Sequence, residues 1–580
     1  MPSKTPKFDK ALDEYFSKLE LDEKGGQWRT CRFSGEKFYV RPEDIVFYKK
    51  IRVPLPTLSP RERIRRKLAF LNTYNLFYGT SASSGKEIIT QYPPETPYRI
   101  YEHQIWFGED LDFREYARDF DSSKSFFEQF KTIQFKVPRP SLQVDATSVS
   151  SDYTNNSSYL KNCYLVFDSY QAEESAYSIA LMNSKNCYDS FTAINTDIGY
   201  DIFESSDLYN CFFIEYSKNC LDSYFLYDCR NCTHCFGGVN LRHKKYVFFN
   251  EQLTKEEYEK RIKAINLGNK DILGHWKDEF NKLKGTALHK ETHNERAISS
   301  LGEYLKNTKN CYASFYMVGA ENTSYSIGGI GTKDSFDILG GADSEFSYDS
   351  FGGINNYNIK FSLNSDFSRE LEYCDLCINC HNCFGCVGLK NKSFCIFNKQ
   401  YEENEYWEMV DKVKIKMLKD GEYGEFFPPA LSPYFYNISI ATSYAGYDDI
   451  ETAKKYGYFV SEIPDLTLKT GGEVIRSDNL PKNIADVNDN IIEAIILDSK
   501  NNKKFRYVRQ EIDFYRKHNL ALPREHFSFR LAEKRKRFGS ILLSLYDRNC
   551  MKCGKKILSS YNPDDSRIVY CEPCYLKEIV

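Results

Sequence analysis

Four cysteines near the C-terminus have the spacing of a metal site. Cys550 and Cys553 are separated by two residues, and 17 residues later Cys571 and Cys574 repeat that spacing. Two such pairs supply four thiolates, which close a tetrahedron around Zn²⁺ in zinc ribbons. Gly554 directly follows the first pair, where a chain that turns back on the metal favours glycine. We predict one Zn²⁺ here, and because no position is left for water, the site is structural rather than catalytic.

A second group of cysteines lies in the middle of the chain, with one cysteine at every third position: Cys374, Cys377, Cys380, Cys383 and Cys386. Two chemistries fit this spacing. Thiolates can hold a second metal ion, or buried free cysteines can act as small hydrophobic side chains in a core. Cys383 also belongs to a longer repeat, which favours the core and leaves the second metal as the alternative.

Two basic runs are candidates for contacts with nucleic acid. They are Arg61, Arg63, Arg65, Arg66 and Lys67 near the N-terminus, and Lys534, Arg535, Lys536 and Arg537 just before the zinc pattern. Both lie in segments predicted as helices, and a solvated helix face is the simpler interpretation. A basic helix beside a zinc ribbon is also a footprint of nucleic-acid binding, and here it occurs twice in a chain of net charge −3.

Internal repeats predict the elements that position these residues. One column of cysteines recurs every 24 residues, at Cys163, Cys187, Cys211 and Cys235, and Cys311, Ser335, Ile359 and Cys383 repeat it at an offset of 148. We interpret each 24-residue unit as one coil of a β-solenoid. Asparagines before the cysteines are expected to hydrogen-bond along the stack, while the cysteines and the aromatic residues after them point inward. Thr254 and Glu257 form a capping box that predicts a helix after the first run.

The two ends of the chain also repeat each other. Residues 38–56 align on residues 505–523, and residues 81–106 align on residues 550–575. The N-terminal copy has lost its metal ligands, since Ser81, Ser84, Glu102 and Ile105 occupy the four cysteine positions. We therefore expect the N-terminal copy to fold by packing alone, with Tyr92, Tyr101 and Trp106 in its core.

The predicted fold is mainly β: a duplicated β-solenoid with helical insertions, flanked by two homologous α+β zinc-ribbon-like modules. The predicted parts are an N-terminal helical segment (1–26), a module without ligands (27–137), solenoid half A (138–250), a helical insertion (251–307), solenoid half B (308–398), a helix and connecting region (399–490), and a module with the zinc ribbon (491–580).

Composition sets the compartment that we expect. The chain has 580 residues, 41% of them hydrophobic and 27% charged. It has no apolar run long enough for a membrane span and no apolar core of a signal peptide near its start. We expect a cytoplasmic protein without a membrane partner. In that compartment its 19 cysteines are thiols or metal ligands rather than disulfides.

The chain resembles a group of uncharacterised Cys/Tyr/Asn-rich repeat proteins with zinc-ribbon modules from candidate-phylum bacteria. The resemblance is carried by NCTHCFGGVNLRHKKYVFFN (231–250), NCHNCFGCVGLKNKSFCIFN (379–398) and CMKCGKKILSSYNPDDSRIVYCEPCY (550–575). It implies the architecture described above and no particular activity. In that group the N-terminal module carries its own cysteines, whereas this chain keeps only Cys31 there, with Ser59 where another is expected.

Three functions compete at this point. The leading hypothesis is a non-enzymatic, zinc-containing binding scaffold whose basic helices bind nucleic acid or a ribonucleoprotein. The first alternative is a carbohydrate-binding or carbohydrate-active protein, with Asp189, Asp201, Asp337 and Asp349 as candidate acids and bases. The second alternative is a structural protein that self-associates through the solenoid.

Overall fold

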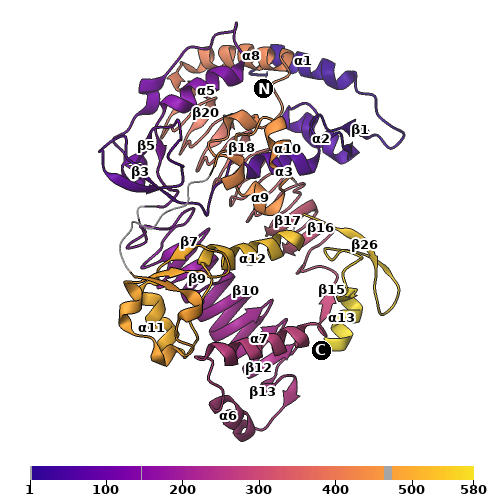
Figure 1. Ribbon diagram of the computed structural model, residues 1–580. Coiled ribbons are helices and arrows are strands. Elements are labelled where there is room, and N and C mark those ends of the chain that lie inside the picture. The colour runs from indigo at the N-terminus through magenta and orange to yellow at the C-terminus, as the bar shows by residue number, and fades with distance from the viewer. Residues whose placement is uncertain (1–2, 146, 448, 463–472, 542, 580) are drawn as a thin grey trace.

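The computed structural model describes residues 3–145, 147–447, 449–462, 473–541 and 543–579. Two ladders of short strands occupy the centre, and helices from both ends of the chain cover them (Figure 1). The protein is mixed α/β, with about 31% strand and 26% helix. The prediction of a mainly β fold therefore underestimates the helical share. Residues 463–472 of the predicted connecting region lie outside the described residues.

The ladders are built from parallel strands, apart from a short antiparallel hairpin at the end of each. The first ladder (residues 144–252) contains β7 (Tyr164–Phe167), β8 (Tyr170–Glu173), β9 (Ala176–Tyr188), β10 (Phe191–Glu215), β11 (Lys218–Tyr227), β12 (Thr233–Val239), β13 (Lys245–Phe248) and β14 (Glu251–Gln252). The second ladder (residues 295–400) contains β16 (Leu301–Lys306), β17 (Tyr312–Val318), β18 (Tyr357–Lys360), β19 (Arg369–Glu372), β20 (His381–Phe384), β21 (Ser393–Ile396) and β22 (Lys399–Gln400). Single bridges continue the second ladder between β17 and β18.

The strands of each ladder pair residues that are 12 apart in the sequence. Cys211 lies opposite Ser223 in the first ladder, and Cys383 lies opposite Cys395 in the second. The predicted 24-residue coil is therefore wrong by a factor of two. The shorter period is hidden in the sequence because cysteine and serine take turns in one column, as in Cys163, Ser175 and Cys187.

A still shorter period of three residues shapes the backbone. Every third residue from Asn156 to Phe249 has a positive φ, and so does every third residue from Tyr304 to Phe397. L-residues rarely adopt this left-handed conformation, and Asn and Asp tolerate it best apart from glycine. The recurring corner of the backbone thus explains why these stretches are rich in asparagine and aspartate.

Most residues that follow a corner point into the narrow interior, and they are small polar or aliphatic side chains such as serine, cysteine and leucine. Ser175 is typical: its hydroxyl donates to the Glu173 carbonyl at 2.7 Å and accepts from the backbone N–H of Cys187 at 3.0 Å. The inward serines and cysteines therefore satisfy backbone groups that no strand partner reaches. The predicted inward column of aromatic residues is wrong, because Tyr188 faces outward and stacks on Phe514 with ring centroids 4.1 Å apart.

Both terminal modules combine short hairpins with helices. The N-terminal module contains α1 (Pro6–Ser17), β1 (Gln27–Thr30), β2 (Lys37–Val40), α2 (Pro42–Ile51), α3 (Pro60–Leu68), β3 (Phe77–Thr80), β4 (Glu87–Thr90), β5 (Ile100–Tyr101), α4 (His103–Phe107), α5 (Phe126–Lys136) and β6 (Arg139–Pro140). The C-terminal module contains β23 (Val474–Arg476), β24 (Ile495–Leu497), β25 (Lys504–Phe505), α11 (Arg509–Lys517), α12 (Phe527–Ile541), β26 (Tyr546–Asn549), β27 (Lys556–Ser559), β28 (Ile568–Tyr570) and α13 (Glu572–Ile579).

Helices also connect these parts. After the first ladder come α6 (Lys255–Lys263), α7 (Lys270–Lys284) and β15 (Leu288–Lys290). The predicted capping box at Thr254 and Glu257 is confirmed at the start of α6. After the second ladder come α8 (Glu403–Lys419), α9 (Ala441–Tyr444) and α10 (Ile450–Lys455).

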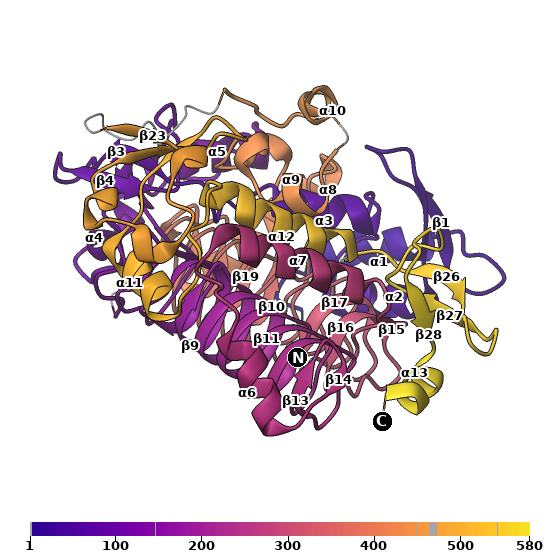
Figure 2. The ribbon, with the colours of Figure 1, turned by 60° about the horizontal axis from the view of Figure 1, so that its bottom comes forward.

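Each module packs on the ladder that is farther from it in the sequence. Phe47 of α2 stacks on Phe336 of the second ladder at 3.8 Å, and Phe514 of α11 stacks on Tyr188 of the first. Figure 1 shows the indigo N-terminal helices beside β18 and β20, and the yellow α12 beside β9 and β10. Figure 2 shows α7 and α12 lying across the strands of the first ladder. The two modules therefore fasten the two ladders into one structure.

Candidate metal centre and charged clusters

The structure brings the four C-terminal cysteines together. One ligand atom from each of Cys550, Cys553, Cys571 and Cys574 lies within 4.8 Å of all the others. The first pair sits in the turn between β26 and β27, and the second pair flanks the start of α13. Four sulfur atoms this close can hold one metal ion, so the predicted ligand set is confirmed as a group that is able to bind a metal.

The backbone around Cys550 favours the thiolate form of this residue. Burial opposes ionisation of Cys550, but backbone N–H groups, that of Cys571 among them, lower the pKa of its thiol to about 6. The Cys571 N–H donates directly to the Cys550 sulfur at 3.2 Å. Gly554 has φ +74° and donates to the Cys550 carbonyl at 2.9 Å, as the predicted tight turn requires. A thiolate is the form of cysteine that binds metal.

The N-terminal copy replaces the metal ligands with a hydrogen-bonded cluster. Glu102 stands at the position of Cys571 and accepts hydrogen bonds from the hydroxyls of Ser81, Ser83 and Ser84. Burial is the largest single influence and opposes ionisation, but the three donors together outweigh it and lower the pKa of Glu102 to about 2. The predicted core residues Tyr92 and Trp106 are buried, and Tyr101 is half-buried.

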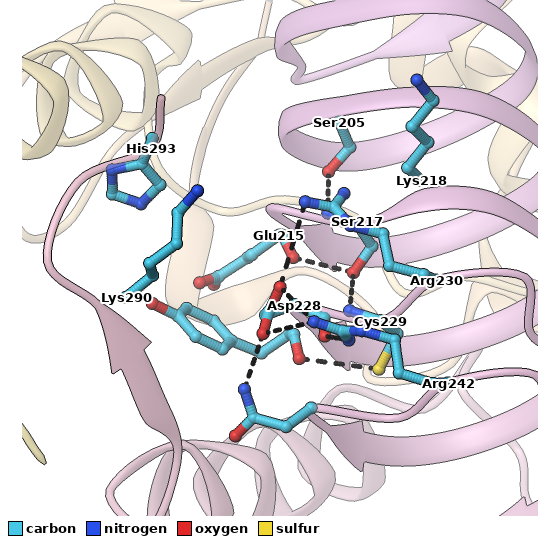
Figure 3. A network of polar contacts seen from close by, with 12 residues as sticks. Ser205, Glu215, Ser217, Lys218, Asp228, Cys229, Arg230, Arg242, Lys290 and His293 are labelled. Carbon is cyan, nitrogen blue, oxygen red and sulfur yellow. Dashed lines mark hydrogen bonds and ion pairs between the residues drawn. The ribbon is translucent and has the colours of Figure 1, made fainter. Parts of the chain in front are cut away.

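A polar network ties the metal centre to the first ladder. Asp228 accepts hydrogen bonds from Tyr575, the residue after Cys574, and from Asn240 at 2.6 Å. Arg242 forms an ion pair with Asp228 at 3.1 Å and donates to the Tyr575 hydroxyl at 2.8 Å. Figure 3 shows Asp228 and Arg242 together, beside the inward Ser217 and Cys229. The module is also attached by parallel pairing of β28 with β15.

The N-terminal basic run lies on α3, as predicted, but its side chains point into the protein. Arg63, Arg65, Arg66 and Lys67 are at most 5% exposed, and only Arg61 reaches the surface. Arg63 pairs with Asp337 at 2.8 Å, and Lys67 pairs with Asp349 at 2.5 Å. Arg65 and Arg66 pair with Glu62 and Glu425, so burial leaves these four side chains without access to the phosphates that were predicted as their partners.

The C-terminal basic run repeats this arrangement on α12. Lys534 pairs with Asp201 at 2.5 Å, and Arg537 pairs with Glu215 at 2.6 Å. Arg535 lies over the Tyr74 ring at 4.5 Å, and only Lys536 is exposed. In the same helix Arg530 pairs with Asp189. The predicted nucleic-acid contacts of this run are therefore largely replaced by internal ones.

These ion pairs also involve the residues of the carbohydrate hypothesis. Its four candidate carboxylates, Asp189, Asp201, Asp337 and Asp349, each lie on a ladder face that is covered by a module helix, and each pairs with a cation of that helix. A general acid or base must reach the substrate. Asp189, Asp337 and Asp349 are at most 4% exposed and do not meet this requirement, whereas Asp201 keeps 30% exposure beside Lys534.

The mid-chain cysteines line the interior of the second ladder. Cys374, Cys377, Cys380, Cys383 and Cys386 are all 0–1% exposed, and each thiol donates to a backbone carbonyl. Within the part of the chain that the structure describes, the C-terminal four are the group close enough to hold a metal, and the mid-chain run is not such a group. The core interpretation therefore fits these five, and the second metal site does not.

Sequence reasoning missed the docking contacts that pair α2 with the second ladder and α11 with the first. Tyr325 donates to Asp44 at 2.7 Å, and Tyr177 donates to Glu511 at 2.6 Å. A signal for them exists, because Asp44 and Glu511 are related by the terminal offset of 467 and the two tyrosines by the ladder offset of 148. The two offsets show that equivalent acids and equivalent tyrosines make both contacts, but which module meets which ladder comes from the structure alone.

A comparison of the chain with protein-family models and with curated proteins found no match. Among the described helices, none combines the length and the apolar character that crossing a membrane requires.

Proposed function

We propose that this protein is a non-enzymatic binding scaffold in which a structural Zn²⁺ holds the C-terminal module. The proposal rests on one observation: the side chains that could do chemistry are engaged in contacts within the fold. The four ladder aspartates are engaged in ion pairs that attach the modules, and the four clustered sulfurs leave no ligand position open for a substrate. The charged and metal-binding groups thus serve assembly.

The scaffold itself is two β-solenoids of 12-residue coils. Parallel pairing at a step of 12, a backbone corner at every third residue and inward small or aliphatic side chains support a chain wound into a narrow rod. In such a rod each coil contacts mainly its neighbours, and the outer columns of side chains form long rigid surfaces. Two sides of each rod are covered by helices of the modules and of the connecting segments, and we assign binding to the two sides that face solvent.

The chemistry of the donors favours zinc. Four thiolates in two pairs, each with two intervening residues, match the ligand set of structural zinc sites. A bound Zn²⁺ would be coordinated by the Cys550 thiolate, which the backbone already favours. It would also connect α13 to the turn between β26 and β27. Through Tyr575 the same helix holds Asp228 of the first ladder, so the metal would also stabilise the docking of the module.

The test is metal content together with limited proteolysis on the full chain, purified without chelator. We expect one zinc per chain, and we expect a strong chelator to expose cleavage sites within residues 543–579 while the ladders stay resistant. Cys31→Ser is the matched control, because Cys31 is buried outside the cluster and its loss should leave zinc content unchanged. Absence of metal together with equal resistance before and after chelation would overturn the proposal.

A further inference from the structure

One column of the first ladder breaks the rule that neighbouring strands avoid like charges. Lys218, Arg230 and Arg242 occupy equivalent positions on three successive steps, because Lys218 pairs with Arg230 and Arg230 pairs with Arg242 in the parallel bridges. Steps of a ladder are about 4.8 Å apart. Like charges directly opposite one another destabilise a sheet, so a ligand that neutralises them would offset that cost.

The carboxylates nearby do not fully neutralise the column. Arg242 is committed to Asp228 at 3.1 Å. Lys218 and Arg230 approach Asp207 and Asp228 only to 4.0 Å, and their side chains remain 41% and 35% exposed. Figure 3 shows the three cations following one another along the ladder, with Lys290 and His293 on a separate segment across from them.

A shallow hollow of about 510 Å³ lies beside two of these cations. Its lining consists of Asp207, Lys218, Asn219, Arg230 and Asn231. The Asn219 amide donates to Asn231 at 2.6 Å, and Asp207 accepts from Asn195 at 2.9 Å. The single carboxylate of the lining and the two amides are therefore already hydrogen-bonded, whereas the two cations keep exposed charge beside the hollow. This balance favours an anion with several oxygen acceptors.

The column is not a requirement of the fold. At the offset of 148 the second ladder carries Asp366, Ile378 and Lys390 at the same three positions. Lys390 there donates to the backbone carbonyl of Gly108 at 2.8 Å and so serves module packing. The first ladder alone has three cations in register, and this points to a ligand that only the first ladder binds.

Aromatic groups lie past the backbone corner that follows the column: Tyr209 is in register with Leu221, three residues after Lys218, and the half-buried His234 comes four residues after Arg230. His234 and Tyr246 stack on each other with ring centroids 5.6 Å apart and an interplanar angle of 8°. Tyr209, two residues beyond Asp207, is 46% exposed. Nucleic-acid bases stack on such rings without regard to sequence, whereas a basic groove tracks the phosphates. A simple polyanion such as polyphosphate would use the cations and leave the rings unused.

From this combination we propose that the Lys218–Arg230 column binds the phosphodiester backbone of a single-stranded nucleic acid, with bases placed on the neighbouring aromatic rings. The inference rests on the scaffold function proposed above and names its ligand. It moves the predicted nucleic-acid contact from the two module helices, whose cations are largely engaged within the fold, to a solvent side of the first ladder.

The test is fluorescence anisotropy of the full chain with labelled 12-nucleotide oligo-U and oligo-dT between 50 and 200 mM NaCl. Two or three contacted phosphates give a slope of about −1.4 to −2.1 in log K against log salt, at about −0.7 per phosphate for a single strand. Lys218→Gln with Arg230→Gln should flatten this slope by about 1.4. Arg61→Gln with Lys536→Gln removes two exposed cations of the module helices and is the matched control, with no change expected. The oligo-U and oligo-dT arms distinguish RNA from DNA as the source of the phosphates.

Three results would overturn the inference: no binding, binding that ignores salt, or equal losses in the column variant and the control. A further experiment uses Tyr209→Ala, which should weaken binding of oligo-dT but leave competition by polyphosphate unchanged. Equal effects on oligo-dT and polyphosphate would show a polyanion-binding surface without base stacking and would also overturn the inference. Zinc content and chelator-induced proteolysis are measured on the same preparations. A chain with one zinc and no oligonucleotide binding refutes the column alone, whereas a chain without metal refutes the scaffold proposal.

Discussion

The hairpin β26–β27 near the C-terminus and the hairpin β3–β4 near the N-terminus have the same backbone conformation. Their strands pair in the same register, Tyr546 with Ser559 and Phe77 with Thr90. Their turns end on glycines with φ +74° in both, Gly554 and Gly85. The side chains at the ligand positions nevertheless differ completely, with four cysteines in one copy and two serines, a glutamate and an isoleucine in the other.

The difference shows that the turn does not depend on a metal for its shape. In both copies the residue at the first ligand position donates to the backbone carbonyl of the lysine five residues later, at 2.8 Å. What differs is how the turn is attached to the rest of its module. The N-terminal copy has its own packing: Tyr92 stacks on Tyr434 at 5.3 Å, and Phe77 and Ile100 share that core. The C-terminal copy instead packs Tyr561 on His289 at 5.3 Å, pairs β28 with β15, and adds four sulfurs that are able to hold a metal.

The largest expected effect is the loss of one ligand from the C-terminal copy. Cys571→Ser should lower zinc content from one per chain to near zero and open the module to proteolysis, because structural zinc contributes about 10–16 kcal/mol of apparent binding free energy in small domains. The measurement is elemental analysis with mass mapping of the cleavage sites. Ser81→Ala at the matching position of the other copy is the control, and it should keep both the metal and the fold.

The second experiment tries to erase the difference by installing ligands in the N-terminal copy. The quadruple variant Ser81→Cys, Ser84→Cys, Glu102→Cys and Ile105→Cys should raise zinc content from one to two per chain, because the backbone that presents the ligands is already in place. Elemental analysis again gives the answer. A content that stays at one, with the variant folded, would mean that the shared backbone does not place four sulfurs closely enough.

The third experiment compares how the two modules are fastened to their ladders. Asp337→Ala leaves Arg63 buried without its carboxylate, which costs about 3–5 kcal/mol for a buried pair. Asp189→Ala at the equivalent position of the first ladder should cost less, because Arg530 is 13% exposed and Arg63 only 4%. Urea unfolding measures both costs. Adding Arg63→Met to Asp337→Ala should recover most of the loss, and no recovery would contradict a cost that comes from the unpaired charge.

The sequence predicts a feature of this structure well when the residues that form it lie close together in the chain. The spacing of Cys550 to Cys574 predicts the ligand set because two short turns carry it. The repeats predict the ladders, but they suggest a repeat of 24 residues instead of the 12 that separate paired strands. The reason is that Ser175 and Ser223 alternate with cysteines in one column. The role of Arg63 and Lys67 was not predictable from their own run, because their partners Asp337 and Asp349 lie more than 270 residues away. A basic run looks the same whether it faces water or a distant carboxylate.

The smallest expected effect concerns the carboxylate that replaces the metal. Glu102→Ala removes the acceptor shared by Ser81, Ser83 and Ser84, and a lost hydrogen-bond acceptor near the surface costs about 1 kcal/mol. The change should be local, so hydrogen exchange of residues 77–106, corrected for intrinsic rates, is the measurement. Exchange should rise there and stay unchanged in residues 543–579, which contain the matching turn of the other copy.

Acid distinguishes this cluster from an ordinary packing contact. The pKa of Glu102 is about 2 in the folded chain against an ordinary 4.5, so its ionised form is the one that the fold stabilises. That contribution is fully present above pH 4.5 and is lost as the pH falls toward 2. The difference in exchange between wild type and Glu102→Ala should therefore be largest at neutral pH and should shrink below pH 4.5. A difference that stays constant down to pH 2 would show that Glu102 contributes through packing rather than through its charge. The ionised carboxylate would then not stabilise the N-terminal copy in place of the lost metal ligands.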